Sequence, residues 1–436
     1  MNPLKLACAL FSVTALSVSV GAQTDPIAPL DKPSELIGNA KVVIDTKAAA
    51  NDNNAFTTAL YERIRGQAGN IFFSPYSIWS ALGMTYAGAR ADTAKEMEAA
   101  MHLSLSGASL HASVAALNKA LQDDATKNKY QLNIANQLWG EKTFEEFFLD
   151  GFLSLNKTYY GTSLQALNFK QDPAGSAKII NQWASDKTNA RIKNIVSERH
   201  FRGSDSTAMV LTNAIYFKGN WAAQFKKANT KEAAFFLDTK ETTKAKFMSQ
   251  ESRLRYSEDS DAQLVALPYL GGKLEMLVLL PTEKAGLSAI ESTLSSPKLA
   301  SLISSLRTEE VQLKLPKFKI ENKRSVTEPL KSLGMTTAFD KRSADFSGIA
   351  DPKKVSALLG NSKLHIFDIL QNAFVEISEE GSEAAAVTAV ITGVVAESVK
   401  RPKRPKVFTA NHPFLFLIRD AKTGAILFMG RCSSPV

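Results

Sequence analysis

Hydrophobic positions recur along this chain with two different periods, which predicts both helices and strands from about residue 51 onward. The stretch "NNAFTTALYERIRG", which ends at Gly66, spaces its apolar residues as a helix does. "NIFFSPYS" predicts a short buried strand that stops at Pro75, and "SIWSALGMTYAGARADTAKEMEAAM" predicts two helices joined by a turn. We therefore expect a helix, a short buried strand and two further helices in the first part of the chain.

The remainder of the chain is richer in strand patterns. "YQLNIANQLWG" and "EEVQLKLPKFKIEN" alternate apolar and polar residues, and "TAMVLTNAIYFKGNW" has the apolar, β-rich character of a central strand. Hairpin turns are expected at Gly271-Gly272 and at residues 422–424. Helices are expected in "SAKIINQWASDKT", with Ile179, Ile180 and Trp183 on one side, and in "SVTEPLKSLGMTTAF".

No strand–helix–strand rhythm, internal repeat or low-complexity boundary divides residues 51–436. The pattern therefore predicts a single α+β domain with at least two β-sheets. The composition is that of an ordinary globular chain, with 44% hydrophobic and 22% charged residues.

The first 22 residues predict a signal peptide and hence export. Lys5 gives a positive start, an apolar run extends from Leu6 to Val20, and Val20-Gly21-Ala22 has the small-residue pattern of a cleavage site. That run is short for a membrane span, and no other stretch reaches its length. We expect a periplasmic or extracellular protein with no membrane partner. Residues 23–50 contain three prolines and little periodicity, which predicts a linker.

Without that segment Cys432 is the only cysteine, so an internal disulfide is excluded and a large core must stabilise the protein. The formal net charge is +9. One short run is strongly basic and could bind a polyanion, although a solvated loop is the simpler interpretation. No nucleic-acid-binding motif accompanies it, so no nucleic acid is expected as a partner. The basic residues of the run are Lys400, Arg401, Lys403, Arg404 and Lys406.

The sequence carries no motif of a common catalyst. It lacks a G-x-S-x-G elbow, a P-loop, a G-x-G-x-x-G after a strand and an H-E-x-x-H pair. The histidines have no metal-ligand spacing, so neither a metal nor a cofactor is expected. A hydrolase assembled from distant residues stays open as an alternative. The histidines are His102, His111, His200, His365 and His412.

Several segments resemble the serpin family. "FVEISEEGSEAAAVTAV" resembles the hinge of the serpin reactive-centre loop, and "FTANHPFLFLIRDAKTGAILFMGR" resembles the family's C-terminal signature. "NIFFSPYSI", "GMTYAGARADTAKEM", "LTNAIYFKGNW" followed by Phe225, and "LPKF" occur in family order. The resemblance covers residues 51–436. It implies a large central mixed β-sheet with two smaller sheets, about nine helices and an exposed reactive-centre loop at about residues 379–407.

The resemblance also implies a function. Most serpins are monomeric inhibitors that a serine protease cuts once, after which the cut loop inserts into the central sheet as a new strand. Strand alternation would send Ser382, Ala384, Ala386, Thr388, Val390 and Thr392 inward, and all are small or β-branched and uncharged. A non-inhibitory serpin, the alternative, tends to carry charged or bulky residues there. The implied hinge residues are Glu379, Gly381, Ser382, Glu383, Ala384, Ala385, Ala386, Val387 and Thr388.

The family places the cut fourteen residues past the hinge glycine, which here implies the bond Val395–Ala396. A small β-branched residue before the bond suits an elastase-like protease with a shallow apolar pocket. The bond Lys400–Arg401 is the alternative and would suit a trypsin-like protease.

Further residues match family positions where the sheet opens. Ser74, Ser77 and Asn213 match polar positions beneath its centre, where Gln371 replaces the usual histidine. Trp221 and Phe225 match aromatic residues at the top of the sheet. Lys317 is expected to pair with Glu379 there.

Overall fold

The computed structural model describes residues 42–436 except 129, 163, 202–208, 238–240 and 383–403. Its strands form two sheets. The strands of the six-stranded sheet are β2 (Gln131–Glu141), β3 (Gln165–Leu167), β4 (Met209–Asn220), β10 (Phe318–Ser325), β11 (Ile366–Ile377) and β12 (Gly381–Ser382). Those of the nine-stranded sheet are β1 (Ile71–Phe73), β5 (Lys231–Phe236), β6 (Thr242–Glu258), β7 (Ala262–Pro268), β8 (Leu274–Pro281), β9 (Arg307–Pro316), β13 (Lys406–Thr409), β14 (Phe414–Asp420) and β15 (Ile426–Cys432).

The described residues also form helices. The α-helices are α1 (Thr46–Ile64), α2 (Pro75–Tyr86), α3 (Ala91–Ala100), α4 (Gly107–Asn128), α5 (Asp150–Tyr160), α6 (Pro173–Lys187), α7 (Leu287–Thr293), α8 (Ser296–Ser304), α9 (Thr327–Ser332) and α10 (Pro352–Leu359). Short 3-10 helices are η1 (Lys142–Phe147), η2 (Glu198–His200), η3 (Lys227–Asn229) and η4 (Thr337–Phe339).

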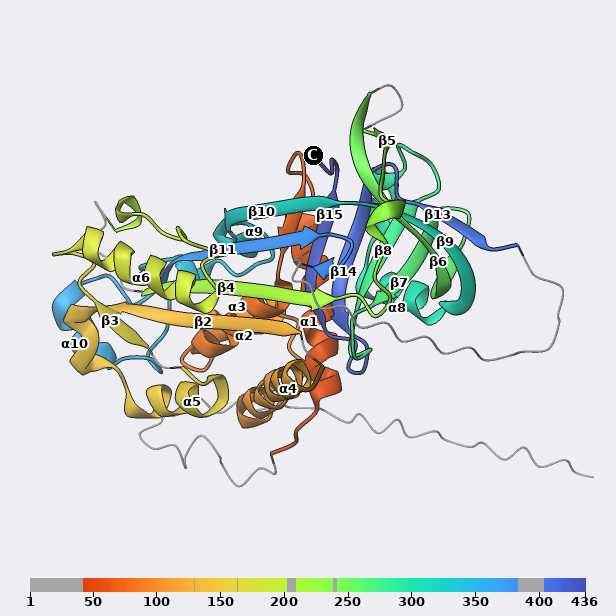
Figure 1. Ribbon diagram of the computed structural model, residues 1–436. Coiled ribbons are helices and arrows are strands. Elements are labelled where there is room, and N and C mark those ends of the chain that lie inside the picture. The colour runs from red at the N-terminus through yellow and green to blue at the C-terminus, as the bar shows by residue number, and fades with distance from the viewer. Residues whose placement is uncertain (1–41, 129, 163, 202–208, 238–240, 383–403) are drawn as a thin grey trace, which may run out of the picture.

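The six-stranded sheet has the order β10-β11-β12-β4-β2-β3, and its long strands run side by side across Figure 1. It is mixed, because β2 and β4 pair antiparallel whereas β11 and β4 pair parallel. Successive residues of β4 belong to different core clusters: Leu211 and Ile215 to the main core that contains α2, and Val210 and Ala214 to the cluster that contains α6. Strand β4 is therefore buried on both faces of the sheet.

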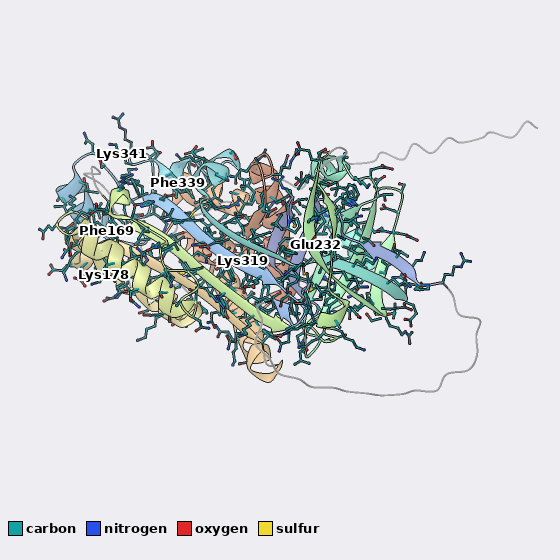
Figure 2. The ribbon with its side chains drawn as sticks, turned by 45° about the horizontal axis from the view of Figure 1, so that its top comes forward. Phe169, Lys178, Glu232, Lys319, Phe339 and Lys341 are labelled. Carbon is teal, nitrogen blue, oxygen red and sulfur yellow. The ribbon has the colours of Figure 1, made fainter. Side chains whose placement is uncertain are left out.

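The nine-stranded sheet has the order β1-β15-β14-β8-β7-β6-β9-β13, with β5 paired to β6. The long strand β6 pairs with β7 through residues 255–258 and with β9 through residues 247–256. The two smaller sheets that the family resemblance implies therefore share β6 and form one hydrogen-bonded system. Figure 2 shows this division, with Lys178 of α6 and Lys319 of β10 on the six-stranded side and Glu232 of β5 on the other.

The first helix begins earlier than the sequence pattern predicted. Asp45 caps it by accepting hydrogen bonds from the backbone of Lys47 and Ala48, and Ala49 and Ala50 are fully buried. Residues 46–50 therefore belong to α1 and not to a linker. The predicted signal peptide and the rest of the linker, up to residue 41, lie outside the described residues.

Two local predictions were wrong. The segment "EEVQLKLPKFKIEN" is not one strand, because β9 ends at Pro316 in the nine-stranded sheet and β10 starts at Phe318 in the six-stranded sheet. Ile179 does not share the buried side of α6, because 46% of its surface is exposed whereas Ile180 is fully buried. Most other predicted elements are present, including the hairpin of β14 and β15. Within the described ranges, no helix combines the length and the apolar character that crossing a membrane requires.

Candidate functional site

The six-stranded sheet contains a slot between β4 and β11, and β12 occupies its upper end. Gly381 pairs antiparallel with Asn220, and Ser382 pairs antiparallel with both Gly219 and Ile377. Lower down, β4 and β11 pair directly with each other in parallel, from Met209–Ile366 to Ile215–Ala373. The slot is thus filled by two residues of the predicted hinge and closed beneath them.

A tight turn brings the chain from β11 back into the slot. The backbone N–H of Ser378 donates to the carbonyl of Gly381 at 2.9 Å, and the N–H of Gly381 donates back to the carbonyl of Ser378 at 3.3 Å. Gly381 has a φ of +152°, and a Cβ at this position would lie 2.0 Å from the backbone oxygen of Gly219. Only glycine satisfies both requirements.

Two carboxylates anchor this turn. Glu379 is 6% exposed, and Lys317 Nζ lies 2.7 Å from its Oε2 while the hydroxyl of Thr230 donates to its Oε1 at 2.8 Å. The predicted pair of Lys317 and Glu379 is therefore present. Burial raises the pKa of Glu379, but the hydrogen bonds from Lys317, the backbone and Thr230 outweigh it and hold the pKa below its usual value. Glu380 pairs with Lys227 at 2.9 Å.

The predicted aromatic residues lie directly against the hinge. The Trp221 side chain donates from Nε1 to the carbonyl of Ser378 at 3.0 Å, and its backbone N–H donates to the carbonyl of Glu380 at 2.9 Å. The backbone N–H of Phe225 donates to the carbonyl of Glu379 at 3.0 Å. Both aromatic side chains are almost completely buried. They hold the turn at the mouth of the slot.

A row of polar side chains crosses the sheet beneath the slot. Asn213 on β4 lies opposite Gln371 on β11, and the amide of Gln371 donates from Nε2 to Asn213 Oδ1 at 2.8 Å. The same Nε2 donates to the carbonyl of Ser74 at 3.0 Å, and the backbone N–H of Ser74 donates to Gln371 Oε1 at 3.1 Å. Asn213 donates from Nδ2 to the hydroxyl of Ser77. The four residues predicted to lie here therefore form one hydrogen-bonded network.

Ser74 also caps the N-terminus of α2, because its hydroxyl accepts a hydrogen bond from the backbone N–H of Ser77 at 3.2 Å. The network thus joins β4, β11 and α2. Every neutral amide in it can donate and accept at once, and none of them titrates.

Asn136 of β2 completes the row and was missed by the sequence analysis. It lies opposite Asn213 in the sheet and accepts hydrogen bonds from Asn213 Nδ2 and, at 3.3 Å, from the hydroxyl of Ser77. The sequence contained a signal for it, since Asn136 falls between Ile134 and Leu138 on the apolar side of an alternating strand.

Many predicted loop residues are outside the described residues. They include both predicted cut sites and most of the inward-pointing hinge positions: Glu383, Ala384, Ala385, Ala386, Val387, Thr388, Val395, Ala396, Lys400, Arg401 and Lys403. Of the basic run, Arg404 is exposed, and the half-exposed Lys406 forms an ion pair with Glu258. Among the described residues, no group of three His, Cys, Asp or Glu side chains is arranged to hold a metal ion.

Comparison with known proteins identifies this arrangement. A family model described as serpin (serine protease inhibitor) matches residues 51–435. The chain belongs to the serpin family. It is 38% identical to human serpin B4, with 88% of this chain and 98% of that protein covered, and 35% identical to human leukocyte elastase inhibitor, with 91% and 98% covered.

The fold comparison agrees with the family match. The crystal structure of native protease nexin-1 with heparin superposes with a TM-score of 0.76 at 30% identity, over 90% of this chain and 100% of that one. The predicted serpin fold is thereby confirmed. Membership in a family of serine protease inhibitors supports protease inhibition as the general activity of this serpin.

Proposed function

We propose that this serpin is a single-use inhibitor that traps a serine protease at Val395–Ala396. The catalytic serine of the protease attacks the carbonyl carbon of Val395, the peptide bond to Ala396 breaks, and the new amine leaves while Val395 stays bound as an ester. The loop on the Val395 side then inserts between β4 and β11. The observation that carries this proposal is β12, because Ser382 already pairs antiparallel with both strands.

The register of β12 determines where further loop residues would go. Each additional residue of an inserting strand moves one position down β4 and one down β11, because both pairings are antiparallel. Continued in this way, Thr388 arrives between Asn213 and Gln371, which already face each other. A threonine hydroxyl can donate and accept at once, so it can replace the amide–amide hydrogen bond that insertion breaks.

Side-chain direction also favours insertion. Ser382 is fully buried and its hydroxyl points to Tyr269. Residues at even spacing from Ser382 would point the same way, and from Ala384 to Thr392 all of them are uncharged and small or β-branched. A charged side chain at any of these positions would be buried without a partner, which costs several kcal/mol, about 3–5 where such losses have been measured.

The energy available is sufficient to hold a protease. Insertion separates seven residue pairs of β4 and β11 and replaces this ladder with two antiparallel ladders. The net gain is roughly a dozen hydrogen bonds, and at about 0.5–1.5 kcal/mol each this amounts to on the order of 10 kcal/mol. That is comparable with the whole stability of a typical domain, about 5–15 kcal/mol.

The target class follows from Val395, since a small β-branched side chain fits the shallow pocket of an elastase-like protease. The similarity to a leukocyte elastase inhibitor supports this choice. Incubation with an elastase-like enzyme should give a complex that survives boiling in detergent, and the released peptide should begin at Ala396. A peptide that begins at Arg401 would instead assign the cut to Lys400 and the target to trypsin-like proteases.

A matched pair of variants tests insertion itself. Thr388→Arg places a charge on the inward side and should abolish trapping, so that the protease merely cleaves the loop. Glu383→Arg places the same charge on the opposite side of the strand, beside Lys218 and Glu376, which are only half-buried, and should leave complex formation intact. Undiminished trapping by Thr388→Arg would refute the insertion mechanism. A non-inhibitory binding function would instead leave both variants and the wild type without any complex.

We also propose that the serpin is exported through residues 1–22 and acts as a monomer, to be tested by N-terminal sequencing of the mature protein and by size-exclusion chromatography. The basic run is proposed as a polyanion site formed by Lys400, Arg401, Lys403, Arg404 and Lys406, of which Lys406 also pairs with Glu258 at the surface. Retention on heparin at low salt should disappear when these five residues are neutralised. If the wild type is not retained, the site does not exist.

A further inference from the structure

Tyr269 connects the two sheets at the slot. It follows β7 in the nine-stranded sheet, but its fully buried ring lies against residues of the six-stranded sheet. The ring stacks on Trp221 with centroids 4.6 Å apart and planes 16° apart, and it meets Phe217 of β4 edge-on at 4.9 Å. An isolated β-bridge joins the backbones of Tyr269 and Trp221. These contacts fix the direction in which the phenol points.

The phenol points at the first loop residue in the slot. The hydroxyls of Tyr269 and Ser382 lie 2.5 Å apart, and both residues are fully buried. Burial raises the pKa of Tyr269, so the phenol stays neutral and can donate this hydrogen bond. Within the part of the chain that the structure describes, Ser382 Oγ has no other hydrogen-bond partner. Withdrawal of Ser382 from the slot would break the hydrogen bond between the two hydroxyls.

We propose that Tyr269 is a positioning residue whose hydroxyl holds Ser382 in the slot and thereby controls how far the reactive-centre loop extends from the resting inhibitor. The consequence for inhibition rests on the proposed trapping function. The hydrogen bond between Tyr269 and Ser382 does not depend on that function, because it is present in the uncleaved protein.

The bond should act at two stages of the reaction. Before cleavage it keeps the hinge in the sheet and so restrains the loop that a protease must grasp. After cleavage it holds the first residue of the inserting strand. Loss of one buried hydrogen bond changes an equilibrium about threefold to tenfold. Tyr269→Phe should therefore raise the association rate with the protease about threefold or more. It should also raise the number of inhibitor molecules consumed per trapped protease.

Three variants and a control test this inference: Tyr269→Phe, Ser382→Ala, the double variant and Tyr76→Phe. Tyr76 is a fully buried tyrosine on α2 whose hydroxyl donates to Asn118 Oδ1 at 2.8 Å. Its substitution removes a comparable bond away from the slot, so it should lower stability without changing association or stoichiometry. The double variant should differ from wild type no more than either single variant, because both remove the same bond.

Amide hydrogen exchange in the uncleaved serpin separates this inference from the proposed function. Tyr269→Phe should speed exchange at Gly381 and Ser382 about threefold or more, with no protease present. Suppose that the wild type traps proteases, but that Tyr269→Phe shows wild-type amide exchange at Gly381 and Ser382 and associates with the protease at the wild-type rate. The positioning role of Tyr269 is then refuted, while the proposed inhibition stands. If exchange accelerates but no protease is trapped by the wild type, the positioning role stands and the proposed function fails. Additive effects in the double variant would also overturn the pairing.

Discussion

Acid should destabilise this serpin through one buried histidine, His111 of α4. The imidazole is 3% exposed, and its Nδ1 lies 2.8 Å from the hydroxyl of Tyr160 on α5. Tyr86 of α2 and Tyr159 of α5 also contact the ring. The groups that face it from these helices are therefore phenols, which cannot balance a positive charge. Burial lowers the pKa of His111 to about 4.

The size of the effect follows from the difference between the folded and unfolded pKa values. An unfolded histidine has a pKa of about 6.5. Because folding depresses the pKa of His111, the stabilisation is complete above pH 6.5 and is lost as the pH falls toward the folded pKa. Each pKa unit corresponds to about 1.4 kcal/mol, so the free energy of unfolding should fall by about 2.5 kcal/mol between pH 7.5 and pH 4.5 through this residue.

Urea unfolding of the uncleaved serpin at these two pH values measures the effect. His111→Phe keeps a ring in the site but cannot bind a proton, so it should lose about 2.5 kcal/mol less than wild type on acidification. Tyr160→Phe removes the hydrogen bond but keeps the buried imidazole, so its loss on acidification should persist. If wild type and His111→Phe lose equal stability between pH 7.5 and pH 4.5, then His111 does not titrate as its burial implies.

Three further changes probe the hinge. Gly381→Ala should expel the turn from the slot, because its Cβ would collide with the carbonyl oxygen of Gly219. We expect the free energy of unfolding to fall by about 1–3 kcal/mol. A thermal unfolding curve that matches wild type would contradict this. Lys317→Met leaves the buried carboxylate of Glu379 without its ion pair and should cost about 2 kcal/mol at neutral pH, allowing for the partial exposure of the lysine. That deficit should shrink in acid as Glu379 becomes protonated, which parallel unfolding curves would detect. Ser382→Arg should stall insertion and convert the inhibitor into a substrate, and a gel that still shows the covalent complex at wild-type yield would contradict it.

Patterns within one element predicted that element well. The alternation of β2, the apolar character of β4 and the glycine-bounded hairpins correspond to observed strands, because burial of one or both faces dictates the spacing of apolar residues. The hinge was also predictable, since the family motif places Glu379 and Gly381 two residues apart in the chain, and its partner Lys317 came from a separate segment that resembles the family, "LPKF".

Features that depend on contacts between distant elements were not predictable in this way. The junction of β9 and β10 left a trace that was overlooked: apolar residues occupy odd positions up to Leu315 and even positions from Phe318. This change of phase marks the point at which the chain passes from one sheet to the other. Tyr269 left no trace, because it lies in an ordinary hairpin segment and acquires its partner, Ser382, only when the two sheets meet.

The strands that follow the loop, β13, β14 and β15, have a consequence for the cleaved inhibitor. These strands carry everything after the loop, and β14 lies fully buried between β8 and β15. A cut at Val395 would therefore leave the fragment from Ala396 to Val436 clamped inside the body without a covalent link. The spent inhibitor should migrate as one particle under native conditions and separate into two polypeptides only in denaturant.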